Sequence, residues 1–364
     1  MSARGGSGAG MGRRRVLGAI GAAAILPALG GEALGAPAAL ASGEEVPLLP
    51  DLPIIDPHHH LRDARDSADP RPRYRAEAFL ADVARSGHRI VDTVFIECSI
   101  MYRPDGPVEQ RSLGETAYVA AEAARMAAQG HRMASGIVGR VDLRQGERVP
   151  ELLAMHAQAS GGRLRGIRNS IAWDNWPPLA GMGLDPHLLE DRAFCTGFAA
   201  LAPAGLVFDV WLFHPQMGAV RDLARAFPDT TIVVNHLACP LEMGPYAGQR
   251  EAVFAAWRAG MTDLAACPNV VMKLGGLGPF WARAEGAPQP GSQELAAQWR
   301  LWIETGIDLF GPHRAMFESN YPANAPVSGY GRIWNAFKRI TAGASQAETA
   351  ALYSQTARRV YGLG

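Results

Sequence analysis

Histidine side chains in this sequence gather where short apolar runs end. His58, His59 and His60 form a triplet after one such run, and His214 and His236 each end a later one. Because side chains alternate along an extended chain, His58 and His60 share one face while His59 points to the other. Imidazoles that converge on one point suit zinc or another divalent transition metal. The sequence therefore predicts a metal site built from His58, His60, His214 and His236, with hydrogen-bonded core or rim positions as the alternative.

Two carboxylates and one amide end further apolar runs. Glu97 closes an early run, and Glu318 and Asn320 follow the last one. Glu318 is two residues before Asn320, so it lies on the same face but one layer deeper. A carboxylate can take a proton from an attacking water, whereas an amide cannot act as a general base. Glu97 is the first candidate for this role and Glu318 the second, and ion pairing with an inward Arg or Lys is the alternative for each.

Three cations also end apolar runs, at Arg140, Arg168 and Lys273. Like charges repel in a low-dielectric interior, so three neighbouring cations need an anion to compensate them. A carboxylated substrate supplies that charge, and pairing with nearby protein carboxylates is the alternative. Trp173 and Tyr102 lie in predicted loops at the same end of the runs, where their rings could pack against a flat substrate. Ordinary packing within the protein is the alternative for each.

Strand-like runs and helical patterns alternate along the chain and supply the framework for these residues. The eight runs are 52–56, 91–97, 135–140, 164–168, 206–213, 231–236, 270–273 and 315–318. Leu295, Trp299, Trp302 and Ile303 between two of them have helical spacing, and Ser345 with Glu348 forms a capping box at the start of the last helix.

This alternation predicts a parallel sheet with helices outside. Eight units over roughly 270 residues match the about 250 residues of a (β/α)8 TIM barrel, whose catalytic groups lie at the carboxyl ends of the strands. The alternative is an open doubly wound sheet, but no G-x-G-x-x-G motif follows an early strand. Nothing in the composition indicates a second domain.

Composition narrows the range of partners. The 364 residues carry 35 Lys plus Arg and 35 Asp plus Glu, and 48% of them are hydrophobic. A formal charge of zero argues against a nucleic-acid or anionic-membrane binder, and a small molecule is the expected partner. Four cysteines in a chain of this length exclude a disulfide scaffold. The oligomeric state is left open.

The first 41 residues have the pattern of an export signal. Arg13-Arg14-Arg15 precedes a weakly apolar stretch from Val16 to Leu29, and Ala39-Leu40-Ala41 has the small-x-small pattern of a cleavage site. The apolar stretch is about 14 residues, short of the roughly 20 that span a bilayer. We therefore expect a twin-arginine signal over residues 1–41, a barrel domain over 42–364, and a periplasmic or extracellular location without stable membrane insertion.

The mature part of the chain resembles the amidohydrolase superfamily, and within it the amidohydrolase-related group of lactonases and aromatic-acid decarboxylases. The resemblance rests on the segments Asp56-Pro57-His58-His59-His60-Leu61, Phe213-His214-Pro215-Gln216, Val234-Asn235-His236, Val271-Met272-Lys273-Leu274 and Met316-Phe317-Glu318-Ser319-Asn320-Tyr321-Pro322. It implies that His58 and His60 are the strand-one metal ligands and that His214 and His236 are the strand-five and strand-six histidines. The family typically has Asp where this chain has Asn320, and often has Asp where it has Asn235.

The resemblance and the residues together predict a metal-dependent hydrolase of a small carboxylated lactone, ester or amide. The metal, with zinc as the first choice, would polarise the carbonyl and activate water. Loss of the strand-eight Asp raises two alternatives: a decarboxylase or other lyase acting on a carboxylic acid, and an exported binding protein without catalysis.

Overall fold

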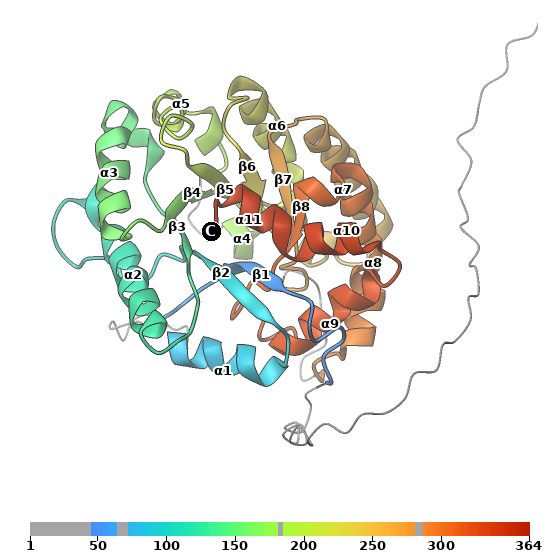
Figure 1. Ribbon diagram of the computed structural model, residues 1–364. Helices are drawn as coiled ribbons and strands as arrows, with labels where there is room; N and C mark the ends of the chain where they lie inside the picture. Colours follow the sequence, from blue (N-terminus) through green and yellow to red (C-terminus); the bar gives the residue numbers. More distant parts are fainter. Residues whose placement is uncertain (1–44, 64–71, 181–184, 280, 282–286) are drawn as a thin grey trace, which may run out of the picture. The chain divides into compact units, whose positions relative to one another are not determined.

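The computed structural model describes residues 45–63, 72–180, 185–279, 281 and 287–364. The predicted signal peptide 1–41 lies outside these residues and stays a prediction. Eight parallel strands follow one another around a nearly closed barrel in the order β1 to β8 (Figure 1). The described residues thus form a single domain consistent with the predicted (β/α)8 TIM barrel. No helix among them is long and apolar enough to cross a bilayer.

The strands are short and mostly buried. They are β1 Ile54–His59, β2 Ile90–Ile96, β3 Gly136–Gly139, β4 Leu164–Ser170, β5 Val207–Trp211, β6 Ile232–Val234, β7 Val270–Leu274 and β8 Ala315–Phe317. All eight predicted runs are present as strands. The chemistry-bearing residues His214, His236 and Glu318 therefore lie just beyond the ends of β5, β6 and β8.

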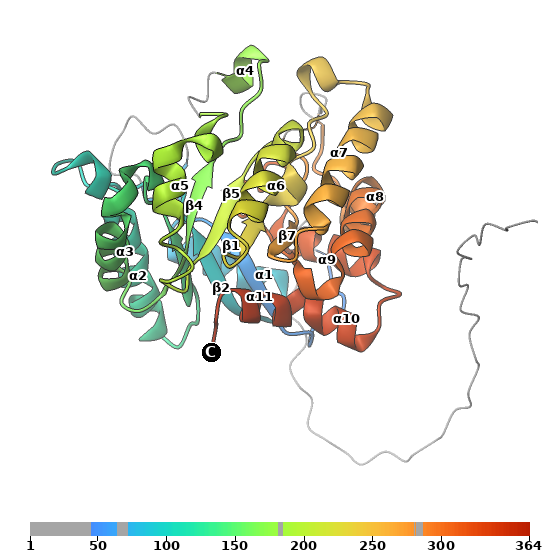
Figure 2. The same cartoon turned by 90° about the horizontal axis from the view of Figure 1, so that it is seen from above.

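Helices surround the strands, as Figure 2 shows. They are α1 Ala76–Ser86, α2 Leu113–Ala127, α3 Val149–Ala159, α4 Pro177–Ala180, α5 Arg192–Phe198, α6 Met217–Ala226, α7 Arg250–Ala265, α8 Ser292–Phe310, α9 Tyr330–Ile340, α10 Gln346–Ala350 and α11 Thr356–Val360. The predicted helical residues between Leu295 and Ile303 lie buried on α8. The capping box of Ser345 and Glu348 begins α10 as predicted.

The first strand is longer at its carboxyl end than the run 52–56 predicts. It continues through Pro57 to His59, and its register with β2 shifts between Asp56 and His59. Proline has no N–H to donate to a ladder, and such an irregularity is where a strand accommodates it. The extension makes His58 a strand residue.

The barrel closes through the segment that follows β8. His60 donates its backbone N–H to Tyr321 O at 2.8 Å, and Asn320 donates its own to His58 O at 3.0 Å. These bonds place Asn320 beside the end of β1. The opposite end of the barrel is filled by the C-terminal segment, whose Tyr361 and Leu363 pack against inward residues of the strands. In Figure 2, α4 and α11 mark these two opposite ends.

Candidate active site

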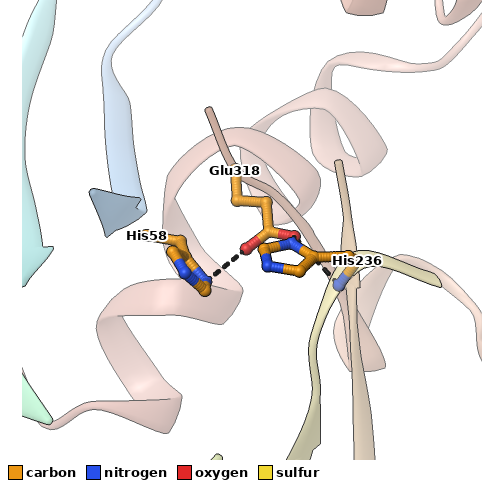
Figure 3. Close-up of side chains that lie close together, drawn as sticks. All are labelled: His58, His236 and Glu318. Carbon is orange, nitrogen blue, oxygen red and sulfur yellow. Dashed lines mark hydrogen bonds and ion pairs between the residues drawn. The ribbon is translucent and has the colours of Figure 1, made fainter. Parts of the chain in front are cut away.

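Two histidines and one carboxylate meet at the carboxyl end of the barrel (Figure 3). The ligand atoms of His58, His236 and Glu318 all lie within 4.8 Å of one another. Glu318 Oε2 is 2.8 Å from His58 Nδ1, and Glu318 Oε1 is 2.6 Å from His236 Nδ1. All three side chains are buried. Residues up to 260 positions apart in sequence thus form one polar cluster.

His60 extends this cluster toward the cavity. Its Nε2 atom lies 3.3 Å from His58 Nε2 and 3.3 Å from Asn320 Oδ1, while its Nδ1 atom is 2.8 Å from Ile96 O. His59 points away, stacking on Phe79 with ring centroids 4.2 Å apart. The structure therefore brings together His58, His60, His236, Glu318 and Asn320 from the predicted set.

Backbone geometry after β6 and β7 makes this close approach feasible. His236 and the three residues after it all have positive φ values, between 38° and 57°. A side chain on Gly276 would overlap His236 Nδ1, and one on Gly275 would overlap the backbone and Cγ of Glu318. The Gly275-Gly276 pair at the end of an apolar run is a signal that the sequence analysis missed.

Burial keeps the imidazoles at the end of β1 uncharged. The pKa of His58 is lowered well below its usual value, chiefly by burial and then by the charge of Lys273. The pKa of His60 is lowered in the same direction, by burial and then by Arg168. A neutral imidazole has a free lone pair, which is the form that binds a metal.

The donor set of this cluster fits a divalent cation. Three imidazoles and a carboxylate are ligands that zinc accepts. Among the described residues, Glu318 Oε2 has no well-aligned hydrogen-bond donor, although it is fully buried. A buried carboxylate oxygen without a partner is costly, so Oε2 needs either a nearby cation or a proton on the facing Nδ1 atom of His58.

Lys273 lies beneath the cluster and does not line the cavity. Its ammonium is fully buried, 2.7 Å from Asp209 Oδ1 and 3.3 Å from His58 Nδ1. Asp209 also accepts hydrogen bonds from Tyr361 Oη at 2.9 Å and from Asn235 Nδ2 at 2.8 Å. The structure thus places this predicted substrate cation in an ion pair inside the barrel, because Lys273 is a residue of β7 and points into its interior.

A cavity of about 400 Å³ opens beside the cluster. Its lining includes His60, Arg62, Glu97, Cys98, Ser99, Arg140, Arg168, Ser170, Trp211, His236, Gly276, Pro279, Asn320 and Ala323. This size suits a small organic molecule. Arg62, Trp211 and Pro279 are lining residues that the sequence analysis did not single out, because each lies outside the strand-end polar motifs.

The two arginines that were predicted to bind substrate differ in their partners. Arg168 Nε donates to Glu97 Oε1 at 2.9 Å, and both side chains are buried. This contact is the ion pair named above as the alternative for Glu97. The guanidinium of Arg140, by contrast, makes no hydrogen bond or ion pair with any residue that the structure describes. Arg140 is therefore a positively charged residue of the cavity wall that is available to bind an anionic ligand.

The loop behind Glu97 is held by a second buried carboxylate. Glu115 accepts hydrogen bonds from the backbone N–H groups of Cys98 at 2.9 Å and Ile100 at 3.2 Å. Burial, and then the charge of Glu97, raises the pKa of Glu115 to about 8. Ser99 N donates to Glu97 Oε2 at 3.2 Å, so this turn also fixes Glu97. Glu115 is inside a helical pattern, which gave no sign of this contact.

Three further predicted residues, His214, Trp173 and Tyr102, are not among the residues that line the cavity. His214 starts a 3₁₀ turn, and its Nδ1 accepts the backbone N–H of Leu241 at 3.4 Å while its ring faces Tyr246. The structure does not bring His214 into the group of His58, His236 and Glu318. Trp173 donates its backbone N–H to Gln216, and Tyr102 is partly buried. Neither aromatic side chain is among the described lining residues.

Comparison with known proteins identifies the class to which this barrel belongs. Residues 55–363 match the amidohydrolase family, so the match covers most of the chain. The chain therefore belongs to the amidohydrolase family. It is an enzyme of the amidohydrolase type, and metal dependence is typical of that family.

Individual relatives are similar along much of their length. The chain is 32% identical to the uncharacterised protein y4mH of Sinorhizobium fredii over 329 residues, covering 85% of this chain and 99% of that protein. It is 30% identical to an L-fucono-1,5-lactonase of Burkholderia multivorans, covering 68% of this chain and 77% of the relative. A crystal structure of an amidohydrolase from Burkholderia multivorans with bound zinc shares the fold, with a TM-score of 0.68, 24% identity, and coverage of 85% of this chain and 99% of that one.

Proposed function

We propose that this enzyme is an exported, metal-dependent hydrolase of a small carboxylated lactone, ester or amide. The observation that carries the proposal is Arg140, which lines the cavity beside the histidine cluster and has no anionic partner among the residues that the structure describes. Arg is well suited to bind a carboxylate through two parallel hydrogen bonds. The lactonase relative supports a lactone as the first class to test.

A divalent metal, with zinc as the first choice, would be held by the imidazoles of His58, His60 and His236. Such an ion supplies Lewis-acid polarisation of a carbonyl and makes water a stronger nucleophile near neutral pH. Asn320 lies beside His60 and is held by its own hydrogen bond, in which Nδ2 donates to Asn324 Oδ1 at 2.9 Å. As an amide, Asn320 orients groups but does not take protons.

Residues of the cavity wall would bind the substrate and transfer the proton. Arg140 holds the substrate carboxylate and orients the scissile carbonyl toward the histidine cluster. Glu97 carries the only carboxylate among the described residues that line the cavity, so it is the group that takes a proton from the attacking water. Its ion pair with Arg168 holds it in place.

A direct assay tests the proposal. The purified enzyme, loaded with Zn²⁺, is given a panel of small lactones, esters and amides with and without a carboxylate, and the acid released is titrated at constant pH. We expect hydrolysis of carboxylated lactones and loss of that activity after chelation. Absence of hydrolysis over the whole panel, with zinc bound, would count against the proposal.

A second candidate is a decarboxylase on the same barrel. The residue at Asn320 favours it, because this reaction needs no general base to deprotonate a water at that position. Release of carbon dioxide from aromatic and related carboxylic acids, measured without any hydrolysis of lactones, would move this reading to first place. An Asn320→Asp variant that gains hydrolysis would point the same way.

Export by the twin-arginine route is also part of the proposal. It rests on the Arg13-Arg14-Arg15 run and the Ala39-Leu40-Ala41 cleavage pattern. Changing Arg13 and Arg14 to Lys preserves charge but removes both guanidinium groups, and we expect precursor to accumulate in the cytoplasm. Unchanged export of this variant, measured by cell fractionation, would indicate another route.

A further inference from the structure

Glu318 is the residue that connects two of the three clustered histidines. Its carboxylate is fully buried, and each of its oxygens faces the Nδ1 atom of a different imidazole, as Figure 3 shows. It does not belong to the described lining of the cavity, so it lies behind the histidines as seen from a substrate. This position differs from that expected of a group that removes a proton from water.

The contacts of His236 and His60 determine which of their nitrogens carries the proton. His236 Nδ1 is 2.6 Å from Glu318 Oε1, and an ionised carboxylate only accepts hydrogen bonds. His60 Nδ1 is 2.8 Å from Ile96 O, and a carbonyl likewise only accepts. Both imidazoles, when neutral, therefore carry hydrogen on Nδ1 and a lone pair on Nε2.

The Nδ1 atom of His58 has two possible hydrogen-bond partners. Glu318 Oε2 lies at 2.8 Å and can only accept, whereas the Lys273 ammonium lies at 3.3 Å and can only donate. Lys273 already has a closer partner in Asp209, at 2.7 Å. Without a proton on His58 Nδ1, two lone pairs would face each other at 2.8 Å in a fully buried place, which is unfavourable. Placing the proton on His58 Nδ1 satisfies the otherwise unpaired Glu318 Oε2.

From this arrangement we infer that Glu318 is a positioning residue, which accepts the Nδ1 protons of His58 and His236 and so directs the Nε2 lone pairs of both, together with that of His60, to the metal. The inference rests on the proposed function. The Nε2 atoms of His58 and His60 are already 3.3 Å apart, a separation suited to two ligands of one ion. Carboxylates that hold the far nitrogen of a ligating histidine are known to change metal affinity by about 10- to 100-fold.

Two glycines support this assignment. Gly275 leaves room for the side chain of Glu318, and Gly276 leaves room for the ring of His236. The two side chains are thus packed against backbone that admits no Cβ atom, which fixes their mutual distance. A residue held in this way is suited to orient its neighbours.

A Glu318→Gln variant tests the role, because the amide has nearly the same size but one of its two ends can only donate. One of the two histidines then loses its acceptor, and we expect the affinity for Co²⁺ to fall by about 10- to 100-fold. The visible absorption spectrum of the cobalt-loaded variant should match that of the wild-type enzyme, since the coordinating nitrogens stay the same. Asp92→Asn is the matched control: it is also a buried strand carboxylate, paired with Arg132, and should leave the affinity unchanged.

Nitrogen-15 NMR of histidine-labelled wild-type enzyme without metal gives a readout that needs neither the variant nor activity. His58, His60 and His236, assigned from single His→Gln variants, should each show hydrogen on Nδ1. An Nε2–H tautomer at His58 would mean that it accepts from Lys273, and would overturn the inference.

The outcomes separate the inference from the proposed function. Unchanged cobalt affinity in Glu318→Gln, or a changed ligand-field spectrum that makes Glu318 itself a ligand, would overturn the positioning role while leaving a metal enzyme. Failure of the wild-type enzyme to bind cobalt would instead overturn the metal dependence in the proposed function, and the NMR tautomers would then decide the role of Glu318 alone.

Discussion

Buried charges have different partners in two regions of the molecule: the barrel interior beneath the histidine cluster, called the floor below, and the wall of the cavity. In the floor, the ammonium of Lys273 and the carboxylate of Asp209 are fully buried and lie 2.7 Å apart, and Tyr361 donates a further hydrogen bond to Asp209. In the wall, Arg168 is paired with Glu97, but the guanidinium of Arg140 has no partner among the described residues. The charges in the floor are paired with each other, whereas in the wall Arg140 has no anionic partner among the described residues.

This difference indicates which charges serve the fold and which serve a ligand. A buried charge without a partner is strongly unfavourable. The charges in the floor must therefore be paired in the folded enzyme whether or not a substrate is bound. A cation at the edge of a cavity stays hydrated until an anion replaces the water. The comparison therefore predicts that substitutions in the floor change metal binding or stability, while substitutions in the wall change catalysis or substrate binding.

The largest effect should come from removing His58 and His60, which lie at the carboxyl end of β1. We expect the His58→Ala, His60→Ala double variant to lose bound metal, because two of the nitrogen ligands are gone. Metal content of the purified protein, measured by mass spectrometry, checks this. A double change of the exposed His131 and His187 to Ala is the matched control and should keep the metal. Unaltered metal content in the double variant would remove the cluster as the metal site.

A substitution of Glu97 tests whether this residue of the cavity wall accepts the proton of the attacking water. We expect Glu97→Gln to keep fold and metal but lower kcat by roughly 10²- to 10⁴-fold, the usual contribution of a group that transfers a proton. Steady-state kinetics of the metal-loaded enzyme provide the measurement. The control is Glu109→Gln, which removes a partly exposed carboxylate that also pairs with an arginine, Arg148. If the variant raised only KM, Glu97 would be a holder of Arg168 and not a base.

Breaking the floor ion pair should cost stability. Lys273→Met leaves Asp209 as an uncompensated buried charge, so we expect the free energy of unfolding to fall by about 3–5 kcal/mol. Denaturant unfolding checks the value. Arg221→Met, which breaks a surface ion pair with Asp263, should cost only about 0–1 kcal/mol. Equal losses in the two variants would contradict the distinction between floor and surface.

The smallest of the four effects should follow from removal of the open cation. Arg140→Ala deletes charge-assisted hydrogen bonds worth about 1.5–3 kcal/mol, so KM for a carboxylated substrate should rise roughly 10- to 150-fold. The same variant should act normally on a substrate analogue without the carboxylate. Loss of activity toward both substrates would show that Arg140 supports the wall and does not select the ligand.

Local patterns in the sequence are sufficient to predict the barrel and part of the candidate site. Apolar runs and helical spacing predicted all eight strands and the buried face of α8, because burial of one face imposes a period that is visible within a few turns or residues. Alternation along a strand predicted that His58 and His60 share a face and that His59 does not. The structure has this arrangement, with His59 stacked on Phe79.

What lies opposite a given side chain across the barrel was decided only by the tertiary structure. The sequence named Glu97 and Glu318 as candidates for one role, and only the structure shows that Glu318 contacts two histidines while Glu97 lines the cavity and pairs with Arg168. His214 was grouped with His236, but its 3₁₀ turn directs it to Leu241. The period of a strand is a local property, whereas the stagger of neighbouring strands and the turns that follow them depend on contacts between residues far apart in the chain.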